Sequence, residues 1–358
     1  MPRLSVVVPA YQVVGWLEAA LDSILDQDYR DLEVIVVDDG STDGTGGLAD
    51  QVAARDSRVQ VVHQANAGLG PARNTGVRHA TGELLAFADS DDLVLPHAYS
   101  RLVASLDASG SDLSIGAVER LRGTEISMAP LMRANHEHAR TGVRIDDAPL
   151  MLADVFAWNK VFRRSFWDQQ ALTFPTARYE DQPTLTQALV HATFDSLVEP
   201  VYQWRVRDDG TSISQQRAQL SDLTDRWATK EWSLATVREH ADARTVRVFL
   251  RRVLPIDVWE YLRAVPGNTD EYVEQLADGL DRLWPSDGEV RWEQTAIPLR
   301  HRIMGWLVRR RMTAELDQFL AWLDEQPTPL PSREVDGRRV VDHPFVDHPD
   351  LPPELLGP

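Results

Sequence analysis

Short apolar runs alternate with amphipathic stretches over the first 115 residues. The runs predict strands at Leu4–Val8, Glu33–Val37, Val59–Val62, Leu84–Ala88 and Asp112–Ile115. Between the first two, apolar residues recur at the spacing of one helix face, at Leu17, Ala20, Leu21, Ile24 and Leu25. This alternation predicts an α/β fold, with a mostly parallel open sheet flanked by helices.

The pattern changes after residue 115. Residues 116–145 are of mixed polarity, and we expect an irregular excursion over the sheet there. This stretch contains His136-Glu137-His138, which lacks the i, i+4 histidine spacing of a helical zinc site, so we expect it on the surface. A second set of elements is predicted at Trp158–Phe162, Tyr179–Ala192 and Pro200–Arg205.

Helical periodicity from 218 to 326 predicts a smaller helical domain after a first domain at 1–217. The remaining 32 residues, 327–358, contain eight prolines and predict an extended tail. Seven of the eleven tryptophans lie in the helical stretch, where they either fill its core or stack on glycans. They are Trp227, Trp232, Trp259, Trp284, Trp292, Trp306 and Trp322.

Composition narrows the classes of function. Hydrophobic residues at 43% and charged residues at 26% are typical of a globular protein. A net charge of −18 argues against nucleic acid as a partner, and the lack of cysteine excludes disulfides and zinc thiolate sites. The chain starts directly in a strand-like run, without a signal peptide, and has no apolar stretch of the ~18 residues that a membrane span needs. We therefore expect it in the cytoplasm.

Three predicted strands are each followed by polar or special residues. These are Pro9-Ala10-Tyr11, Asp38-Asp39-Gly40-Ser41 and Asp89-Ser90-Asp91-Asp92. Ligands of open α/β sheets bind beyond the carboxyl ends of the strands, so we expect the three loops to border one site.

The third loop places three carboxylates within four residues, and their mutual repulsion calls for a compensating cation. Mg²⁺ or Mn²⁺ would be held by one or two carboxylates together with phosphate oxygens of a substrate. The alternative is that Asp92 caps a helix starting near Pro96 while the other carboxylates are solvated. A calcium loop of EF-hand type is excluded, because Val94 and Ser100 stand where glycine and glutamate are required.

The other two candidate segments suit a nucleotide. Asp39 can accept hydrogen bonds from a nucleobase or a ribose. The competing interpretation of this loop is that Thr42 or Asp43 caps the next helix, and the two roles are compatible. In Asn66–Asn74 the third glycine of a dinucleotide fingerprint is replaced by Arg73, and no P-loop occurs anywhere in the chain. An arginine near a helix N-terminus is typical of a phosphate contact.

The segments Leu4–Tyr11, Val36–Thr45, Asn66–Gly76 and Gly82–Asp92 resemble, in order and spacing, the inverting family 2 glycosyltransferases of GT-A fold. The resemblance implies a metal-dependent transfer from a nucleotide sugar, with a uridine diphosphate sugar as the expected donor. It implies nucleotide-sugar binding by Pro9, Tyr11, Asp39, Asn66, Arg73, Asp89 and Ser90, and a metal ligand at Asp91. Gln12 departs from the asparagine usual in the family, and we expect little consequence.

The resemblance also implies a catalytic base in a Glu-Asp pair, here Asp181 with Glu180 as its supporting carboxylate. The alternative is that Asp181 only stabilises the N-terminus of the helix that contains Pro183. Weaker likenesses suggest acceptor or phosphate contacts at Trp158, Lys160, Arg207 and Ser212.

Residues 157–214 look most similar to glycosyltransferases of bacterial cell-surface polymers, wall teichoic acid enzymes among them. The implied acceptor is a glycan, a polyol-phosphate polymer or a lipid-linked molecule at the inner face of the cell membrane. One hypothesis is that arginines of the helical domain line a track for a polyanion or approach a lipid surface; the alternative is that they pair with neighbouring acids. These arginines are Arg244, Arg247, Arg251, Arg252, Arg300, Arg302, Arg309, Arg310 and Arg311.

Two other functions are compatible with the sequence. One is a glycan- or nucleotide-sugar-binding domain without turnover, which would not need Asp181 as a base. A nucleotidyltransferase is disfavoured, because its glycine-rich loop is missing after Leu4–Val8. The sequence does not disclose the sugar, the oligomeric state, or whether the chain belongs to a longer bifunctional enzyme.

Overall fold

The computed structural model describes residues 2–206, 218–327, 330–335 and 338–357. The chain divides into two compact units. The sheet unit consists of residues 1–212 and 235–241, and the helical unit of residues 213–234 and 242–358.

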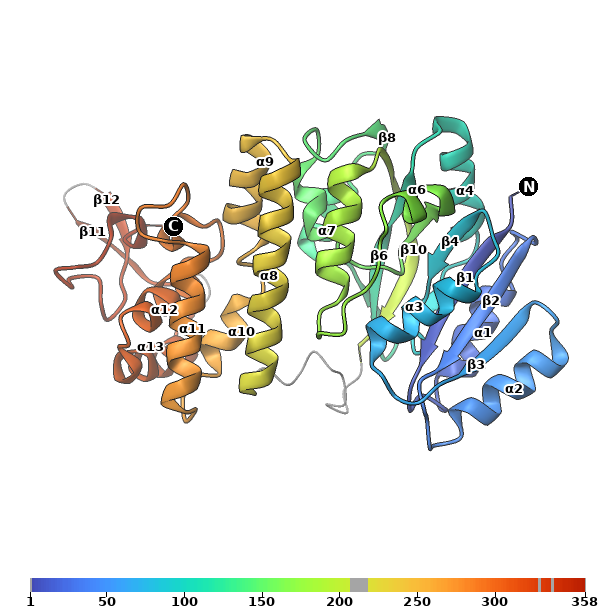
Figure 1. The fold of residues 1–358 in the computed structure, drawn as a ribbon. Helices are drawn as coiled ribbons and strands as arrows, with labels where there is room; N and C mark the ends of the chain where they lie inside the picture. Colours follow the sequence, from blue (N-terminus) through green and yellow to red (C-terminus); the bar gives the residue numbers. More distant parts are fainter. Residues whose placement is uncertain (1, 207–217, 328–329, 336–337, 358) are drawn as a thin grey trace. The chain divides into compact units, whose positions relative to one another are not determined.

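The sheet unit is built on a ten-stranded mixed sheet, in which eight strands follow the order β3-β2-β1-β4-β9-β6-β10-β5, while β7 pairs with β6 and β8 with β10 (Figure 1). The first four run parallel, with β1 between β2 and β4, so the three predicted loops emerge at the same edge. The five strands predicted in the first 115 residues are confirmed with somewhat different ends. The strands are β1 (Leu4–Ala10), β2 (Leu32–Asp38), β3 (Val59–His63), β4 (Leu84–Phe87), β5 (Leu93–Val94), β6 (Leu113–Arg122), β7 (Glu125–Ser127), β8 (Arg140–Val143), β9 (Lys160–Arg163) and β10 (Phe194–Arg205).

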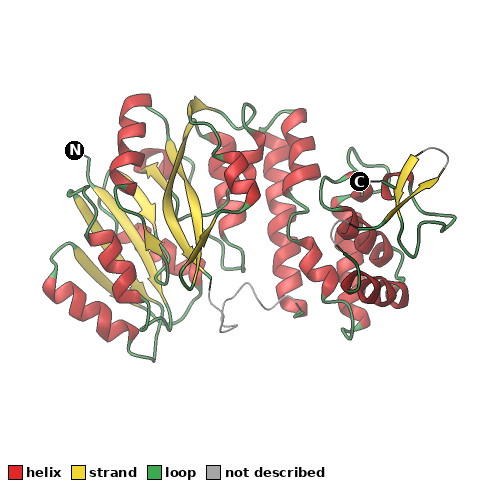
Figure 2. Ribbon diagram, turned by 180° about the vertical axis from the view of Figure 1, so that it is seen from behind, coloured by secondary structure: helices red, strands yellow, loops and turns green. Residues whose placement is uncertain are grey.

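Helices cover both faces of this sheet (Figure 2). The apolar stripe of α1, centred on Leu21, packs together with α4 against one face of β1. On the other face, Ala72 of α3 packs against Ile35 and Val37 of β2. The helices of this unit are α1 (Leu17–Leu25), α2 (Thr45–Arg55), α3 (Leu69–His79), α4 (Ala98–Ser109), α5 (Pro130–Asn135), α6 (Arg164–Gln169) and α7 (Asp181–His191), with a 3₁₀ turn η1 (Pro149–Ala153).

The prediction of an irregular excursion at 116–145 is wrong. This stretch continues β6 and contains β7, α5 and β8. Polar residues on exposed edge strands obscured the pattern, because β7 is exposed at every position. The surface placement of His136 is also wrong, since its side chain is 1% exposed, whereas Glu137 and His138 are exposed.

The helical unit contains the predicted run of helices. They are α8 (Leu220–His240, whose last turns lie in the sheet unit), α9 (Ala243–Val248), the π-helical turn η3 (Phe249–Val253), α10 (Val258–Arg263), α11 (Asp270–Leu283), the 3₁₀ turn η4 (Trp292–Gln294), α12 (Leu299–Arg309) and α13 (Thr313–Asp324). No helix in the described part of the chain is long and apolar enough to cross a membrane.

Tryptophans fill much of the core of this unit. Trp284 and Trp292 are fully buried and meet edge to face at 5.1 Å, and Trp227 and Trp306 are also buried. A side chain on Gly305 would lie 2.2 Å from the Trp292 indole, so this contact requires glycine. Trp259 and Trp322 are half-buried, and Trp232 is exposed.

The segment 327–358 is more structured than the predicted extended tail. It contains a hairpin of β11 (Ser332–Val335) and β12 (Arg338–Val341) and a 3₁₀ turn η5 (Pro353–Leu355). Val340, Val341, Phe345 and Leu355 are buried. The proline content misled the prediction because apolar residues between the prolines pack into a core.

Candidate active site

The loops after β1, β2 and β4 meet because these strands are parallel neighbours. The Asp39 backbone N–H donates to Ala10 O at 2.9 Å and the Ala88 N–H to Val7 O at 3.0 Å, which joins the first loop to each of the others. Pro9 is buried in β1, whereas Tyr11 is 49% exposed beyond its end.

Asp39 organises the second loop. Its Oδ1 accepts from Gln64 Nε2 at 2.7 Å and from Ala67 N at 2.9 Å, and its Oδ2 accepts from Gly68 N at 2.8 Å. Gly40 adopts φ +76°, and a side chain there would lie 2.9 Å from the backbone nitrogen of Asn66. Asp39 and Asn66 are thus brought together, and the carboxylate braces the segment that leads into α3.

Asp43 precedes Gly44, the N-cap residue of α2, which has no side-chain cap. Asp43 Oδ1 accepts from the backbone N–H of Thr45, the first residue of α2, at 3.0 Å. Gln12 has φ +53° and its Oε1 accepts from the backbone N–H groups of Thr42 and Asp43, at 3.1 Å each. Gln12 therefore ties the first loop to the second, a role that its longer side chain can perform in place of asparagine.

Arg73 is the centre of a buried ionic cluster. Its Nη2 donates to Asp89 Oδ1 at 2.8 Å, and its Nη1 donates to Glu180 Oε1 at 2.6 Å and to Asp181 Oδ1. The Arg73 side chain is 1% exposed and lies over the Phe174 ring. It sits in the second turn of α3, and it contacts carboxylates where a phosphate contact was predicted.

Helix α7 begins at Asp181, directly after a strained turn in which Tyr179 has φ +62°. Asp181 and Glu180, 107–108 residues after Arg73, thereby reach the guanidinium opposite Asp89. Three carboxylates around one guanidinium leave an excess of negative charge. The structure thus brings together Arg73, Asp89, Glu180 and Asp181.

Burial and neighbouring carboxylates oppose ionisation in this cluster. Burial raises the pKa of Asp181 to about 8: the positive charges of Arg73 and Lys160 act against the shift, while the charges of Glu180 and Asp89 add to it. The pKa of Glu180 is raised as well, chiefly by burial. A carboxyl group that titrates near neutral pH suits acid–base chemistry.

Asp92 does not cap a helix. α4 begins at Ala98, and β5 lies between the two. The Asp92 side chain is instead anchored to β10, where the backbone N–H of Arg205 donates to its Oδ1 at 2.7 Å. The Tyr202 hydroxyl also bonds Asp92 and accepts the Asp89 backbone N–H at 3.0 Å.

The Asp89–Asp92 loop fits a divalent cation. Burial and the charges of Asp91 and Asp89 raise the pKa of Asp92 well above its ordinary value, and a cation would relieve this crowding. No group of three or more metal-ligating side chains is preformed among the described residues. One or two carboxylates, completed by phosphate oxygens, make up the usual magnesium-type site. Ser90 is buried between the two half-buried aspartates.

Trp158 and Lys160, two of the four suggested acceptor or phosphate contacts, are buried in the protein. Trp158 is buried between Phe156 and Tyr202, with ring centroids 4.7 and 4.2 Å apart. Lys160 is fully buried, and its Nζ donates to Asp154, Phe156 O and Asn159, so its three N–H groups are all used within the protein. A phosphate contact of Lys160 is therefore wrong for this structure. Arg207 and Ser212 lie outside the described residues.

Several arginines of the helical unit pair with acidic side chains, which was the alternative to a track for a polyanion or a lipid surface. Arg247 pairs with Glu289 at 3.1 Å, Arg309 with Asp281 at 2.6 Å, and Arg311 with Glu274 and Asp278.

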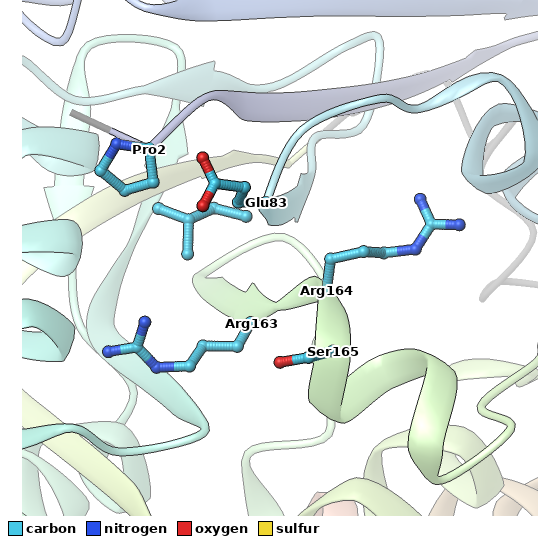
Figure 3. A pocket seen from close by; sticks show the side chains of 6 residues that line it. Pro2, Glu83, Arg163, Arg164 and Ser165 are labelled. Carbon is cyan, nitrogen blue, oxygen red and sulfur yellow. The ribbon is translucent and has the colours of Figure 1, made fainter.

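A separate hollow lies far from these loops along the strands. It has a volume of about 250 Å³ and is lined by Pro2, Glu83, Leu84, Arg163, Arg164 and Ser165 (Figure 3). Pro2 precedes β1, and Glu83 and Leu84 lie at the start of β4. The hollow therefore opens at the amino ends of these strands, opposite the edge where the three loops meet.

Two parts of the site were not predicted from sequence. Tyr202, which links Asp89 and Asp92, lies in a strand whose pairing with β6 contains register shifts. Asp154, which holds Lys160 and His136, follows a short 3₁₀ turn without a periodic pattern. The polar and apolar residues next to Asp154 in the sequence do not indicate that it is buried beside a lysine and a histidine.

The sheet and the arrangement of its flanking helices define a GT-A-like fold. Residues 5–169 match the family model for glycosyl transferase family 2.

Two relatives of Bacillus subtilis are similar over this region. The uncharacterized glycosyltransferase EpsJ is 32% identical over 49% of this chain and 52% of its own length. The putative glycosyltransferase EpsH is 31% identical over 57% of this chain and 61% of its own length. The matched region thus spans less than two thirds of either relative.

Two solved structures share the fold. TarS 1–349 of S. aureus, in complex with UDP-GlcNAc, superposes with a TM-score of 0.67 at 18% identity, covering 95% of this chain and 97% of that one. The mannosyltransferase PcManGT of Pyrobaculum calidifontis, in complex with GDP-Man and Mn²⁺, has a TM-score of 0.51 at 19% identity, covering 91% and 88%.

Proposed function

We propose that this chain is a metal-dependent inverting glycosyltransferase that moves a sugar from a nucleotide sugar to an acceptor hydroxyl. The observation that carries the proposal is a buried cluster in which Arg73 joins Asp89 to Glu180 and Asp181. Asp89 belongs to the three loops after β1, β2 and β4, which we call the donor loops. A domain that only bound a nucleotide sugar would not need a carboxyl group with a pKa near neutrality beside its donor loops.

The reaction uses Asp181 as its base. The acceptor oxygen attacks the anomeric carbon from the face opposite the diphosphate, while the bond between that carbon and the diphosphate oxygen breaks and its electron pair leaves with the diphosphate. The Asp181 carboxylate takes the proton of the acceptor hydroxyl. Protonation of Asp181 reduces the crowding of negative charge around Arg73, while Glu180 and Asp89 keep the guanidinium in place.

Asp91 would hold the divalent cation, with Asp89 beside it. When bound, Mg²⁺ or Mn²⁺ supplies positive charge to the diphosphate as negative charge develops there. Asp39, Asn66, Pro9 and Tyr11 border the proposed nucleoside site. The fold shared with TarS, which was solved with UDP-GlcNAc, supports a uridine diphosphate sugar as the donor.

The resemblance of residues 157–214 to glycosyltransferases of bacterial cell-surface polymers supports an acceptor in cell-wall or surface glycopolymer synthesis, namely a glycan, a polyol-phosphate polymer or a lipid-linked molecule. We place the reaction on the cytoplasmic side, at the inner face of the membrane.

A donor screen tests the proposal. Release of nucleoside diphosphate from a panel of nucleotide sugars is measured with and without Mn²⁺, in the wild type, in Asp181→Asn and in the control Asp168→Asn. Asp168 lies on α6, with a side chain that is 57% exposed. We expect metal-dependent turnover in the wild type and in the control, and a loss of about 10²-fold or more in Asp181→Asn. Turnover that ignores both the metal and Asp181 would exclude the mechanism.

A binding measurement separates the alternative. Tight binding of UDP-sugars without turnover, toward a panel of glycan and polyol-phosphate acceptors, would identify a nucleotide-sugar-binding domain instead.

A further inference from the structure

A second buried ionic cluster lies in the sheet unit, and the proposed reaction does not use it. It consists of His136 at the end of α5, Asp154 after η1, and Asn159 and Lys160 at the start of β9. The side chains of His136, Asp154 and Lys160 are at most 1% exposed. Burying three ionisable groups is costly, so their arrangement calls for an explanation.

The hydrogen bonds determine the charge on Lys160. Its Nζ donates to Asp154 Oδ1 at 2.7 Å, to Phe156 O at 2.7 Å and to Asn159 Oδ1 at 2.8 Å. All three partners are acceptors, and only an ammonium group has three N–H donors. Burial lowers the pKa of Lys160, but the charges of Asp154 and Asp181 act against this shift.

His136 bonds the same carboxylate. Its Nδ1 lies 2.6 Å from Leu197 O and its Nε2 lies 3.1 Å from Asp154 Oδ2. Burial opposes ionisation of Asp154, yet Lys160 and His136 outweigh it and hold the pKa of Asp154 at about 2, so this carboxylate accepts and does not donate. Asp154 is thus fixed between Lys160 and His136.

This cluster lies within electrostatic reach of the base. Asp154 follows η1, which packs against α7, and Asp181 is the first residue of α7. Lys160 and Asp181 each act on the other's charge. The other charged groups that act on Asp181 are Arg73 from α3, Asp89 after β4 and the adjacent Glu180.

We propose that the His136–Asp154–Lys160 cluster is a positioning unit for the base, which holds the Lys160 ammonium within electrostatic reach of Asp181 and favours its carboxylate form. Asp154 keeps the Lys160 ammonium in place, and His136 holds Asp154 from its other oxygen. Its role in catalysis rests on the proposed function, whereas its effect on Asp181 is a property of the resting protein.

The test compares two lysines. Lys160→Met removes the proposed charge, and Lys230→Met is the matched control. Lys230 is also buried, with Nζ donating to a backbone oxygen and to an aspartate, but it belongs to the helical unit. The Asp181 carboxyl group is titrated by NMR in protein labelled with ¹³Cγ aspartate, and its signal is assigned with Asp181→Asn. The pH dependence of kcat/KM is measured alongside.

Losing a positive neighbour makes Asp181 harder to ionise, so we expect its titration midpoint to rise in Lys160→Met. The acidic limb of kcat/KM should move upward by the same amount, with the rate recovering at high pH, and Lys230→Met should leave both unchanged. An unshifted midpoint in Lys160→Met, or activity lost equally at every pH, would overturn the proposal. A shifted midpoint in a protein without turnover would support the proposal while contradicting the glycosyltransferase function.

A second variant applies if Lys160→Met does not fold. Lys160→Gln removes the charge while its amide can still donate to Asp154 Oδ1, and it should shift the Asp181 midpoint in the same direction. An unshifted midpoint in Lys160→Gln would overturn the proposal as well.

Discussion

Replacing Arg73 with methionine should expose how much the carboxylates of the active site repel one another. The change removes the cation that bonds Asp89, Glu180 and Asp181 and keeps a side chain of comparable length. The carboxylate side chains are only 26%, 8% and 21% exposed, so water screens them poorly. Removing one partner of a buried ion pair costs about 3–5 kcal/mol, and we expect this loss in the free energy of unfolding at pH 8.

The loss should depend on pH, in a direction set by the pKa of the carboxyl groups. The folded-state pKa of Asp181 is already raised to about 8, above its ordinary value of 3.8, and removing Arg73 raises it further. A group with a raised folded-state pKa stabilises the fold fully below its unfolded pKa, and the stabilisation is lost as the pH rises through the folded pKa. Arg73→Met should therefore cost less at pH 5 than at pH 8, by about 0.4 kcal/mol through Asp181, whose pKa already lies near 8, and further through Glu180, whose pKa is raised as well.

Urea denaturation at pH 5, 6, 7 and 8, followed by far-ultraviolet circular dichroism, measures this difference. The control is Arg55→Met, which breaks a pair with Glu18 in which both side chains are about half exposed. It should cost about 0–1 kcal/mol at every pH. A cost for Arg73→Met below about 1 kcal/mol, or one that does not change with pH, would refute the reasoning about the cluster.

Three other predictions concern the same site. The value of kcat/KM should fall as the pH drops through about 8, because Asp181 must be ionised to accept a proton, and a flat profile from pH 6 to 9 would contradict its role. Asp91→Asn should abolish the Mn²⁺-dependent part of donor binding in calorimetry without lowering the thermal midpoint, since it removes charge from a crowded loop; unchanged Mn²⁺ dependence would contradict the metal assignment. Gly40→Ala should destabilise the protein by about 1–3 kcal/mol and weaken donor binding, because residue 40 has φ +76° and the new Cβ would lie 2.9 Å from the backbone nitrogen of Asn66. Gly15→Ala, which meets nothing within 4 Å, is its control, and equal effects of the two would argue against the strain.

The parts of the fold that follow local periodicity could be predicted from the sequence. β1, β2 and β4 are buried at every position and are read directly as apolar runs, and their parallel order places the three loops together. The surroundings of each side chain could not be predicted in the same way. Nothing near Lys160 in the sequence shows that its ammonium is saturated by acceptors, and the motif suggested a phosphate contact instead.

The alternative that Asp92 caps a helix fails for a similar reason. Local sequence offers a helix a few residues downstream, but the chain first forms β5, which pairs with β10 more than a hundred residues later. That pairing brings Tyr202 and the backbone of Arg205 to the carboxyl group. Hydrogen bonds from a distant strand thus fix the position of the Asp92 carboxyl group, and local capping preferences do not predict them.

The separation between Arg73 and its partners has a consequence for how the molecule is made. The first four strands, α3 and the three loops come from the first 92 residues, whereas Asp181 follows Arg73 by 108 residues. Closing such a long loop carries a large entropic cost, and during synthesis the N-terminal segments emerge first. We therefore expect the donor half to fold around an arginine that still lacks two of its three counterions, and the base to arrive only when α7 docks. A nascent chain would then be able to bind a nucleotide before it can transfer a sugar.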